Sequence, residues 1–258
     1  VGLNQFLSFN IIYYNILLMD ISIENIDDLI KKKSNNTRQL HPLAPIHPAR
    51  MIITGSSGGG KTNFLVNLIL KCLYFDRIYM YSKHLHQDKY TYLLNHLLLL
   101  EESCKKAGMK KSKIVMKWED NLSELVGNDA LDKKYANLIV LDDFPIPSKA
   151  NKLRIAKLYT SCRHKNTSII TLSQMYFQLE RSTRLNLSYA FIGNNGNKKE
   201  LSLLTTELAC ELSPEQFKKM YKIVHQDKYQ MLMIDNETKD DRLKYRRNLD
   251  QPIDINAL

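Results

Sequence analysis

The segment "GSSGGGKT", residues 55–62, matches the phosphate-binding pattern G-x-x-x-x-G-K-[ST]. Glycines let such a loop curl so that its backbone N–H groups point at a phosphate, and the helix that follows adds its positive dipole end. Lys61 is expected to reach the β- and γ-phosphates of a nucleoside triphosphate, and the Thr62 hydroxyl to ligate Mg²⁺. The predicted binding set is Gly55, Ser56, Ser57, Gly58, Gly59, Gly60, Lys61, Thr62 and Asn63. A Gly/Ser-rich turn is the alternative, which the strand pattern before the loop and the helix pattern after it disfavour.

A second acidic element follows in "LIVLDDFP". Four apolar residues predict a buried strand whose end delivers Asp142 and Asp143 to the edge of the sheet where open α/β sheets bind ligands. Asp142 is expected to hold Mg²⁺, directly or through water. Asp143 is then placed to orient and deprotonate an attacking water. The alternative is an Asp-Asp turn that caps the next helix.

The strand "SIITLSQ" ends in Gln174. Nucleotide kinases and GTPases usually place the acidic strand next to the P-loop strand, whereas ATPases that use an acid and a water insert between them a strand that ends in a polar residue. This strand follows the acidic strand by one helix, which suits such an insertion. Gln174 is therefore predicted to contact the γ-phosphate and the catalytic water; the alternative is a glutamine that caps a strand end facing solvent.

Short apolar strands alternate with helical patterns along residues 50–235. Strands are predicted at residues 50–55, 77–82, 113–118, 137–143, 168–174, 189–194 and 229–235, and helices at 61–75, 88–108, 151–162 and 213–226. Ser213, Pro214 and Gln216 form a capping-box pattern at the start of the last helix. The predicted fold class is α/β, a three-layer P-loop NTPase sandwich with a mainly parallel central sheet and the 168–174 strand between the P-loop (Walker A) and acidic (Walker B) strands.

The predicted organisation is an N-terminal extension over residues 1–47, the main domain over 48–236, and a loose charged tail over 237–258. An amphipathic helix is expected after Met19, which is itself a candidate initiator, with residues 1–18 then belonging to translated upstream sequence. A docking strand or interfacial anchor is the alternative for those residues. The pentapeptide "HQDKY" occurs at His86 and again at His225. Because no longer repeat accompanies them, we interpret the two copies as chance.

The composition limits the kinds of molecule that this chain can be expected to bind. The net charge is +10 and the pI about 9.3, which favours a polyanion such as nucleic acid, although lysine-rich surfaces also serve solubility. The four cysteines show no metal-ligand spacing, so free thiols are expected, with neither zinc nor disulfides. The apolar first twenty residues are too short for a membrane span and lack the marks of a secretory signal. We therefore expect a soluble intracellular protein without a membrane span.

Four segments together resemble the DNA-packaging ATPases of poxviruses and other large cytoplasmic DNA viruses, with relatives in virophages and Polinton-type elements, all of the FtsK–HerA class of P-loop translocases. The segments are "HPARMIITGSSGGGKTNFL", "LIVLDDF", "CRHKNTSIITLSQMYFQL" and "RSTRLNLSYAFIG". The resemblance covers roughly residues 48–235. It implies an ATP-driven motor that moves double-stranded DNA into a capsid as a homo-oligomeric ring in the host cytoplasm, together with capsid or portal proteins.

The resemblance also implies residue roles. ATP and Mg²⁺ are the expected cofactors, held by Lys61 and Thr62; Asp142 is the metal-site acid, Asp143 the catalytic acid and Gln174 the sensor. Many relatives carry Glu where Asp143 stands. Such rings complete each active site with an arginine from the neighbouring subunit, for which the candidates are Arg163 and Arg184. Arg184 is preferred, because a loop after the sensor strand can face the next subunit.

Residues 145–184 contain eight Lys or Arg residues against one acid, Glu180. In a ring this region could line the channel and hold phosphates without reading bases. The candidate DNA contacts are Lys149, Lys152, Arg154 and Lys157, with a solvated helix face as the alternative.

Two other functions compete with a DNA motor. A nucleoside or nucleotide kinase predicts an acceptor pocket and an Arg-rich lid after the P-loop helix, where the chain instead has the Leu-rich "YLLNHLLLLEE". A nucleotide-binding remnant that folds but does not turn over is the third possibility, and the presence of every motif residue argues against it.

Overall fold

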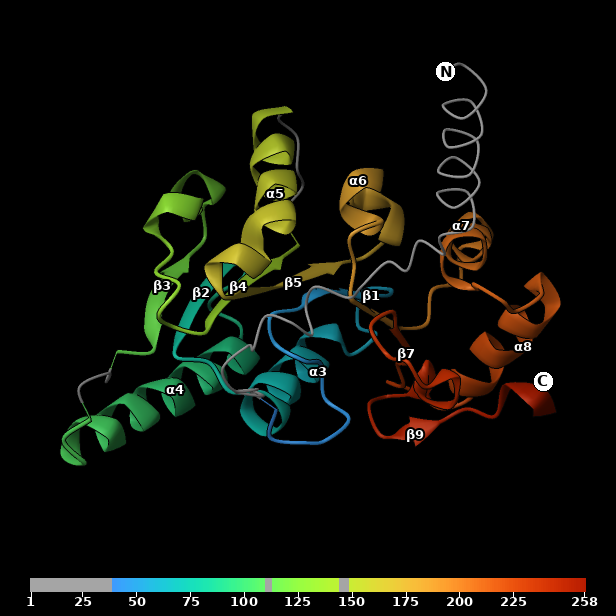
Figure 1. Ribbon diagram of the computed structural model, residues 1–258, viewed down its shortest axis with the longest axis horizontal. Helices are drawn as coiled ribbons and strands as arrows, with labels where there is room; N and C mark the ends of the chain where they lie inside the picture. The colour runs from blue at the N-terminus through green and yellow to red at the C-terminus, as the bar shows by residue number, and fades with distance from the viewer. Residues whose placement is uncertain (1–38, 110–112, 144–148) are drawn as a thin grey trace, which may run out of the picture. The chain divides into compact units, whose positions relative to one another are not determined.

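The computed structural model describes residues 39–109, 113–143 and 149–258 (Figure 1). Within them lies one nine-stranded sheet with the order β3-β2-β4-β5-β1-β6-β7-β8-β9, in which β3 to β6 run parallel and β7 to β9 pair antiparallel. The strands are β1 Arg50–Thr54, β2 Arg77–Ser82, β3 Val115–Glu119, β4 Asn137–Asp142, β5 Thr167–Ser173, β6 Tyr189–Ile192, β7 Leu232–Asp235, β8 Tyr245–Arg247 and β9 Gln251–Pro252. The predicted α/β fold with a mainly parallel sheet is confirmed.

The strand that ends before Gln174 lies where the sequence predicts. In β5, Ile170 is the register partner of Met51 in β1 and of Val140 in β4. β5 is therefore inserted between the P-loop strand and the acidic strand. Because parallel strands end at one edge of a sheet, the segments that follow β1, β4 and β5 meet there.

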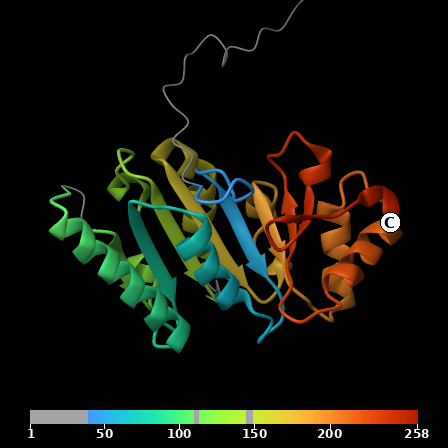
Figure 2. The ribbon, with the colours of Figure 1, turned by 90° about the horizontal axis from the view of Figure 1, so that it is seen from below.

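Helices cover both faces of the sheet, so the predicted three-layer sandwich is also confirmed (Figures 1 and 2). Alternate residues of each strand enter different cores, as Ile52 and Ile53 of β1 do. One core packs against α3 Lys61–Asn67 and α4 Asp88–Lys106, and the other against α5 Lys149–Ser161, α7 Lys198–Leu208 and α8 Pro214–Val224. A four-residue helix, α6 Arg181–Arg184, precedes β6.

Four described α-helices overlap the predicted helical ranges, whereas α6 and α7 were not predicted. The P-loop helix continues beyond α3 as a π-helical turn, Leu68–Cys72, which keeps Leu68 and Ile69 buried. Helix α8 has the predicted capping box, since Ser213 Oγ accepts from Gln216 N–H and Gln216 Oε1 accepts from Ser213 N–H. Helix α7 was not predicted, although Asn197 caps it and an N-cap residue followed three residues later by Glu is a helix-start pattern.

The expectation of a loose tail after residue 236 was wrong. β8 pairs with β7, and the Arg246 side chain, only 3% exposed, donates to Asp235 Oδ2 at 2.9 Å. The Tyr245 hydroxyl donates to the Ala209 carbonyl at 2.6 Å. Charged residues suggested solvent, but the β7 carboxylate neutralises the arginine and lets it enter the core.

Packing also begins before residue 48, because Ala44 is buried against the core on the α3 and α4 face. The expected amphipathic helix and Met19 lie outside the described residues. The four cysteines are free. In the described part of the chain, no helix has the length and apolarity needed to cross a membrane.

Candidate functional site

The phosphate loop connects β1 to α3 in a tightly held conformation. Gly55 approaches the chain after β6 so closely that a Cβ there would lie 3.0 Å from the Gly193 Cα. Gly60 has φ +89°, in the region that favours glycine. Ser56 N–H donates to the Asn194 carbonyl at 3.0 Å. The glycine pattern that suggested the loop is thus required by its geometry.

Lys61 lies folded over this loop. Its Nζ donates to the Gly55 carbonyl at 2.8 Å and to the Ser56 carbonyl at 2.9 Å. Burial lowers the pKa of the Lys61 ammonium, while Asp143 and Asp142 oppose that change. A charged, partly desolvated ammonium beside the loop is suited to exchange these carbonyls for phosphate oxygens.

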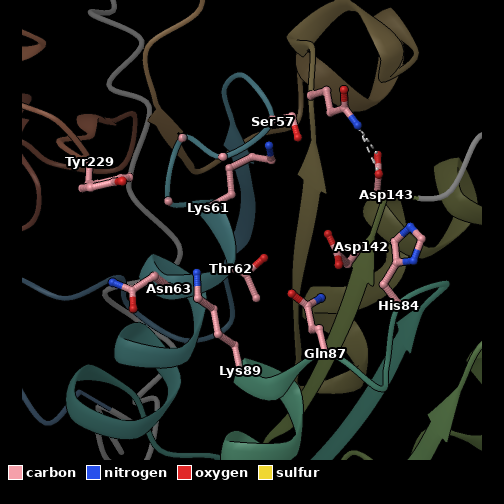
Figure 3. A pocket seen from close by; sticks show the side chains of 14 residues that line it. Ser57, Lys61, Thr62, Asn63, His84, Gln87, Lys89, Asp142, Asp143 and Tyr229 are labelled. Atoms are coloured by element: carbon pink, nitrogen blue, oxygen red, sulfur yellow. Dashed lines mark hydrogen bonds between the residues drawn. The ribbon is translucent and has the colours of Figure 1, made fainter.

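Asp142 is a buried carboxylate at the end of β4. Its Oδ2 accepts from Ser82 Oγ at 2.9 Å and from the Tyr90 hydroxyl at 2.6 Å. Burial raises the pKa of Asp142, and the two hydrogen bonds counteract this in part. Figure 3 shows the Thr62 side chain opposite Asp142, so the two side chains border a common point.

The side chains at this point fit Mg²⁺. A hydroxyl and a carboxylate are hard oxygen donors, and Mg²⁺ usually takes one or two such ligands together with substrate phosphates and water. No group of three or more His, Cys, Asp or Glu side chains that could hold a metal by itself occurs among the described residues. The donors therefore suit a metal that arrives with a nucleotide.

Asp143 and Gln174 lie in hydrogen-bond contact. The Gln174 Nε2 donates to Asp143 Oδ2 at 3.2 Å and Oδ1 at 3.4 Å (Figure 3). Asp143 has φ +49°, which turns the chain sharply after β4. On the other side, the Gln174 carbonyl accepts from Asn195 Nδ2 at 3.1 Å. The structure thus brings the predicted catalytic acid and the predicted sensor together at one edge.

These groups line one cavity of about 790 Å³. Four of its residues were not predicted from the sequence: His84, Gln87, Lys89 and Tyr229. Three of them belong to the repeated "HQDKY", which was interpreted as chance and is the signal that could have identified them. The first copy supplies Gln87, Lys89 and the buried Tyr90, and the second supplies Tyr229. Whatever the origin of the repeat, both copies lie at the phosphate loop.

The two candidate arginine fingers do not line this cavity. Arg184 forms a bidentate ion pair with Glu207 of α7, with Nε and Nη2 each 2.8 Å from a carboxylate oxygen. Its Nη1 donates to the Leu179 carbonyl at 2.6 Å, and its side chain is only 10% exposed. This geometry argues against the preferred finger role, because the guanidinium is already satisfied within its own subunit.

Arg163 lies in a 3₁₀ turn, Cys162–Lys165, at the amino end of β5 and hence at the sheet edge opposite the phosphate loop. It donates to Ser188 Oγ at 3.2 Å and pairs with Glu237, with 44% of its side chain exposed. The "CRHKN" turn has a structural explanation. Asn166, at φ +49°, interacts with His47 at 2.8 Å and closes the turn into β5.

The candidate DNA-contact residues lie on α5. Lys152, Arg154 and Lys157 are exposed, while Ile155 and Leu158 face the core. Lys152 pairs with Glu180 at 2.7 Å, and Arg154 donates to the Leu125 carbonyl at 2.8 Å. The side chain of Lys149 lies outside the described part.

Comparison with known proteins identifies a family, a viral relative and solved structures that share the fold. The family described as "Poxvirus A32 protein" matches residues 43–248. The DNA packaging protein OPG160 of Monkeypox virus is 27% identical over 183 residues, which are 69% of this chain and 57% of that protein. The chain thus spans little more than half the length of that relative.

Solved structures share the fold at low identity. The genome packaging NTPase B204 of Sulfolobus turreted icosahedral virus 2, in complex with ATP-gammaS, is 16% identical with a TM-score of 0.51, over 80% of this chain and 98% of that one. The DNA-packaging ATPase B204 of Sulfolobus Turreted Icosahedral Virus is 14% identical with a TM-score of 0.51, over 81% and 99%. At such identity the similarity establishes the fold alone.

Proposed function

The chain belongs to the poxvirus A32 protein family, and on that premise we propose that it is an ATP-hydrolysing motor that translocates double-stranded DNA during viral genome packaging. Its Monkeypox virus relative is called a DNA packaging protein, and B204, which shares the fold, is described as a genome packaging NTPase. The observation that carries the proposal is the order β4-β5-β1. It brings Lys61, Asp143 and Gln174 to one cavity.

Hydrolysis transfers the terminal phosphate of ATP to water. The water oxygen forms a bond to the γ-phosphorus, the bond to the bridging oxygen of ADP breaks, and the water proton passes to Asp143. Gln174, whose amide lies 3.2 Å from Asp143 Oδ2, orients the same water. Lys61 leaves its two loop carbonyls and neutralises charge on the β- and γ-phosphates.

Thr62 and Asp142 would hold Mg²⁺ in this proposal, and the metal would neutralise part of the phosphate charge. Ser82 and Tyr90 fix the Asp142 carboxylate by donating to its Oδ2. Their hydrogen bonds favour the ionised carboxylate that a metal site needs, against the effect of burial.

Translocation requires contact with DNA and between subunits. The exposed basic residues of α5 are the proposed phosphate contacts. We place the motor in a homo-oligomeric ring at a capsid or portal in the host cytoplasm, with the neighbouring subunit supplying an arginine. Of the two candidates, Arg163 has the more exposed side chain.

ATP hydrolysis measured with and without long double-stranded DNA tests the proposal, for wild type, Lys61→Ala and Gln174→Ala. We expect DNA to stimulate turnover, the first change to abolish it, and the second to reduce it by about 10²-fold or more, the scale of losing a group that positions the reacting water. ATP turnover that DNA does not stimulate but an added nucleoside does would instead identify a kinase. The insertion of β5 between β4 and β1 disfavours that alternative.

A further inference from the structure

Tyr229 is an exposed aromatic residue that lies against the phosphate loop. It belongs to the connection between α8 and β7, and 67% of its surface is exposed. A Cβ placed on Gly60 would lie 3.2 Å from the Tyr229 Cδ1, so the ring contacts the loop closely. Figure 3 shows Tyr229 on the side of Lys61 that faces away from Asp142 and Asp143. The ring is therefore at the end of the cavity opposite the proposed chemistry.

The backbone holds Tyr229 in an uncommon conformation. Its φ is +65°, in the left-handed region that is rare for a bulky residue and is maintained only by its surroundings. Asn248, which follows β8, holds the residues after Tyr229 in place. Its Oδ1 accepts from Met231 N–H at 3.0 Å, and its Nδ2 donates to Gln230 Oε1 at 2.6 Å. The His225 ring is fixed against the Ile192 carbonyl at 3.0 Å. A strained loop held at both ends thus presents a large apolar ring to solvent.

A second cavity, of about 480 Å³, lies between this connection and the phosphate loop. Its walls are residues 56–59, Asn194 and residues 225–230. It adjoins β6 and β7, which lie on the other side of β1 from β5 and β4. A nucleotide whose γ-phosphate lies at Asp143 must extend its remaining part away from β4. The second cavity is on that side.

We propose that Tyr229 stacks on the base of the bound nucleoside triphosphate and that the α8–β7 connection forms the nucleoside site. The inference rests on the proposed nucleotide-dependent function and adds the part of the substrate that the P-loop does not recognise. An aromatic ring stacks on the π-face that every base has. We therefore expect a preference for the larger purines over pyrimidines and little discrimination between ATP and GTP.

Binding of a non-hydrolysable ATP analogue and of inorganic tripolyphosphate, both with Mg²⁺, separates the base from the phosphates. The test variant is Tyr229→Asn, because asparagine removes the ring but tolerates the left-handed backbone better than most other non-glycine residues. The matched control is Tyr229→Phe, which keeps the ring. We expect Tyr229→Asn to weaken binding of the ATP analogue by about tenfold or more, as for loss of one stacked base, and to leave tripolyphosphate binding unchanged. Tyr229→Phe should bind both like wild type.

Two results would overturn the inference. Unchanged affinity of Tyr229→Asn for the ATP analogue would mean that the ring does not stack, and an equal loss for tripolyphosphate would mean that the ring only supports the phosphate loop. Failure of the proposed function looks different. Wild type that binds the analogue, with the stated effect of Tyr229→Asn, but never hydrolyses ATP would leave the nucleoside site intact and reject the motor.

Discussion

Substitution of Arg184 distinguishes a structural ion pair from an arginine finger, because the two roles predict opposite effects on stability and on ATP hydrolysis. Arg184→Ala removes both 2.8 Å contacts to Glu207 and the 2.6 Å bond to the Leu179 carbonyl, and takes from the Glu207 carboxylate its bidentate ion-pair partner. Breaking a buried ion pair costs about 3–5 kcal/mol, and with 10% and 14% of the two side chains exposed we take the lower end, about 3 kcal/mol.

For a domain of this size, about 3 kcal/mol corresponds to a Tm lower by roughly 6–12 °C. The assay is thermal unfolding of Arg184→Ala, Glu207→Ala and the double variant. The double variant should be less destabilised than the sum of the single changes, because residues in contact are not additive. ATP turnover at a temperature where each variant is folded should fall by less than about tenfold, the equivalent of 1.4 kcal/mol in the barrier.

Arg163→Ala is the matched control. That side chain is 44% exposed, and surface ion pairs contribute about 0–1 kcal/mol, so its Tm should stay close to that of wild type. If Arg184→Ala unfolds like wild type yet hydrolyses ATP about 10³-fold more slowly, Arg184 is an arginine finger and its structural role is refuted. In that case the pair with Glu207 would have to open when subunits assemble.

Three other predictions concern stability and DNA binding. Glu200 is buried, and burial raises its pKa. The folded state therefore binds the Glu200 proton more tightly than the unfolded state does, and the protein loses stability as pH rises above the ordinary glutamate range. Glu200→Gln should raise Tm at pH 7, and an increase in Tm that is equally large at pH 4 would contradict this. Arg246→Met leaves the buried Asp235 carboxylate without its ion-pair partner and should lower the free energy of chemical unfolding by about 3–5 kcal/mol. A decrease below about 1 kcal/mol would mean that the pair behaves like one exposed to solvent. Lys157→Ala should make log K for DNA against log salt shallower by about 0.9, whereas Lys218→Ala on α8 should not, and equal slopes would remove α5 from the DNA surface.

The part of the site that could be predicted from sequence lies at strand ends. Lys61, Asp142 and Gln174 each follow or close an apolar run, and parallel strands bring their carboxyl ends to one edge whatever the loops between them do. The fold and the β5 insertion could also be predicted. The parallel sheet followed from the order of the elements along the chain and the rules that such sheets obey. The insertion of β5 needed, in addition, the strand order of ATPases that use an acid and a water.

What could not be predicted depends on contacts between distant segments. Tyr229 reaches the phosphate loop only because β7 returns antiparallel beside β6, which period and propensity do not reveal. Arg184 was expected in a loop that faces the next subunit, and its ion-pair partner, Glu207, lies on α7, which was not predicted. The tail after residue 236 was judged by its charge, and the one buried acid that admits Arg246 lies on another strand.

The placement of Gln174 has a mechanical consequence. Two hydrogen bonds join the turn after β5 to segments beyond β6. The Gln174 carbonyl accepts from Asn195, and the Tyr176 N–H donates to Glu200 at the start of α7. Asn195 is in turn tied to α8 through the Tyr221 hydroxyl at 2.7 Å. In the proposed mechanism Gln174 contacts the γ-phosphate, and any shift of its backbone when that phosphate leaves would stretch or break these hydrogen bonds. The end of β5 is thus coupled through Asn195 and Glu200 to helices α7 and α8.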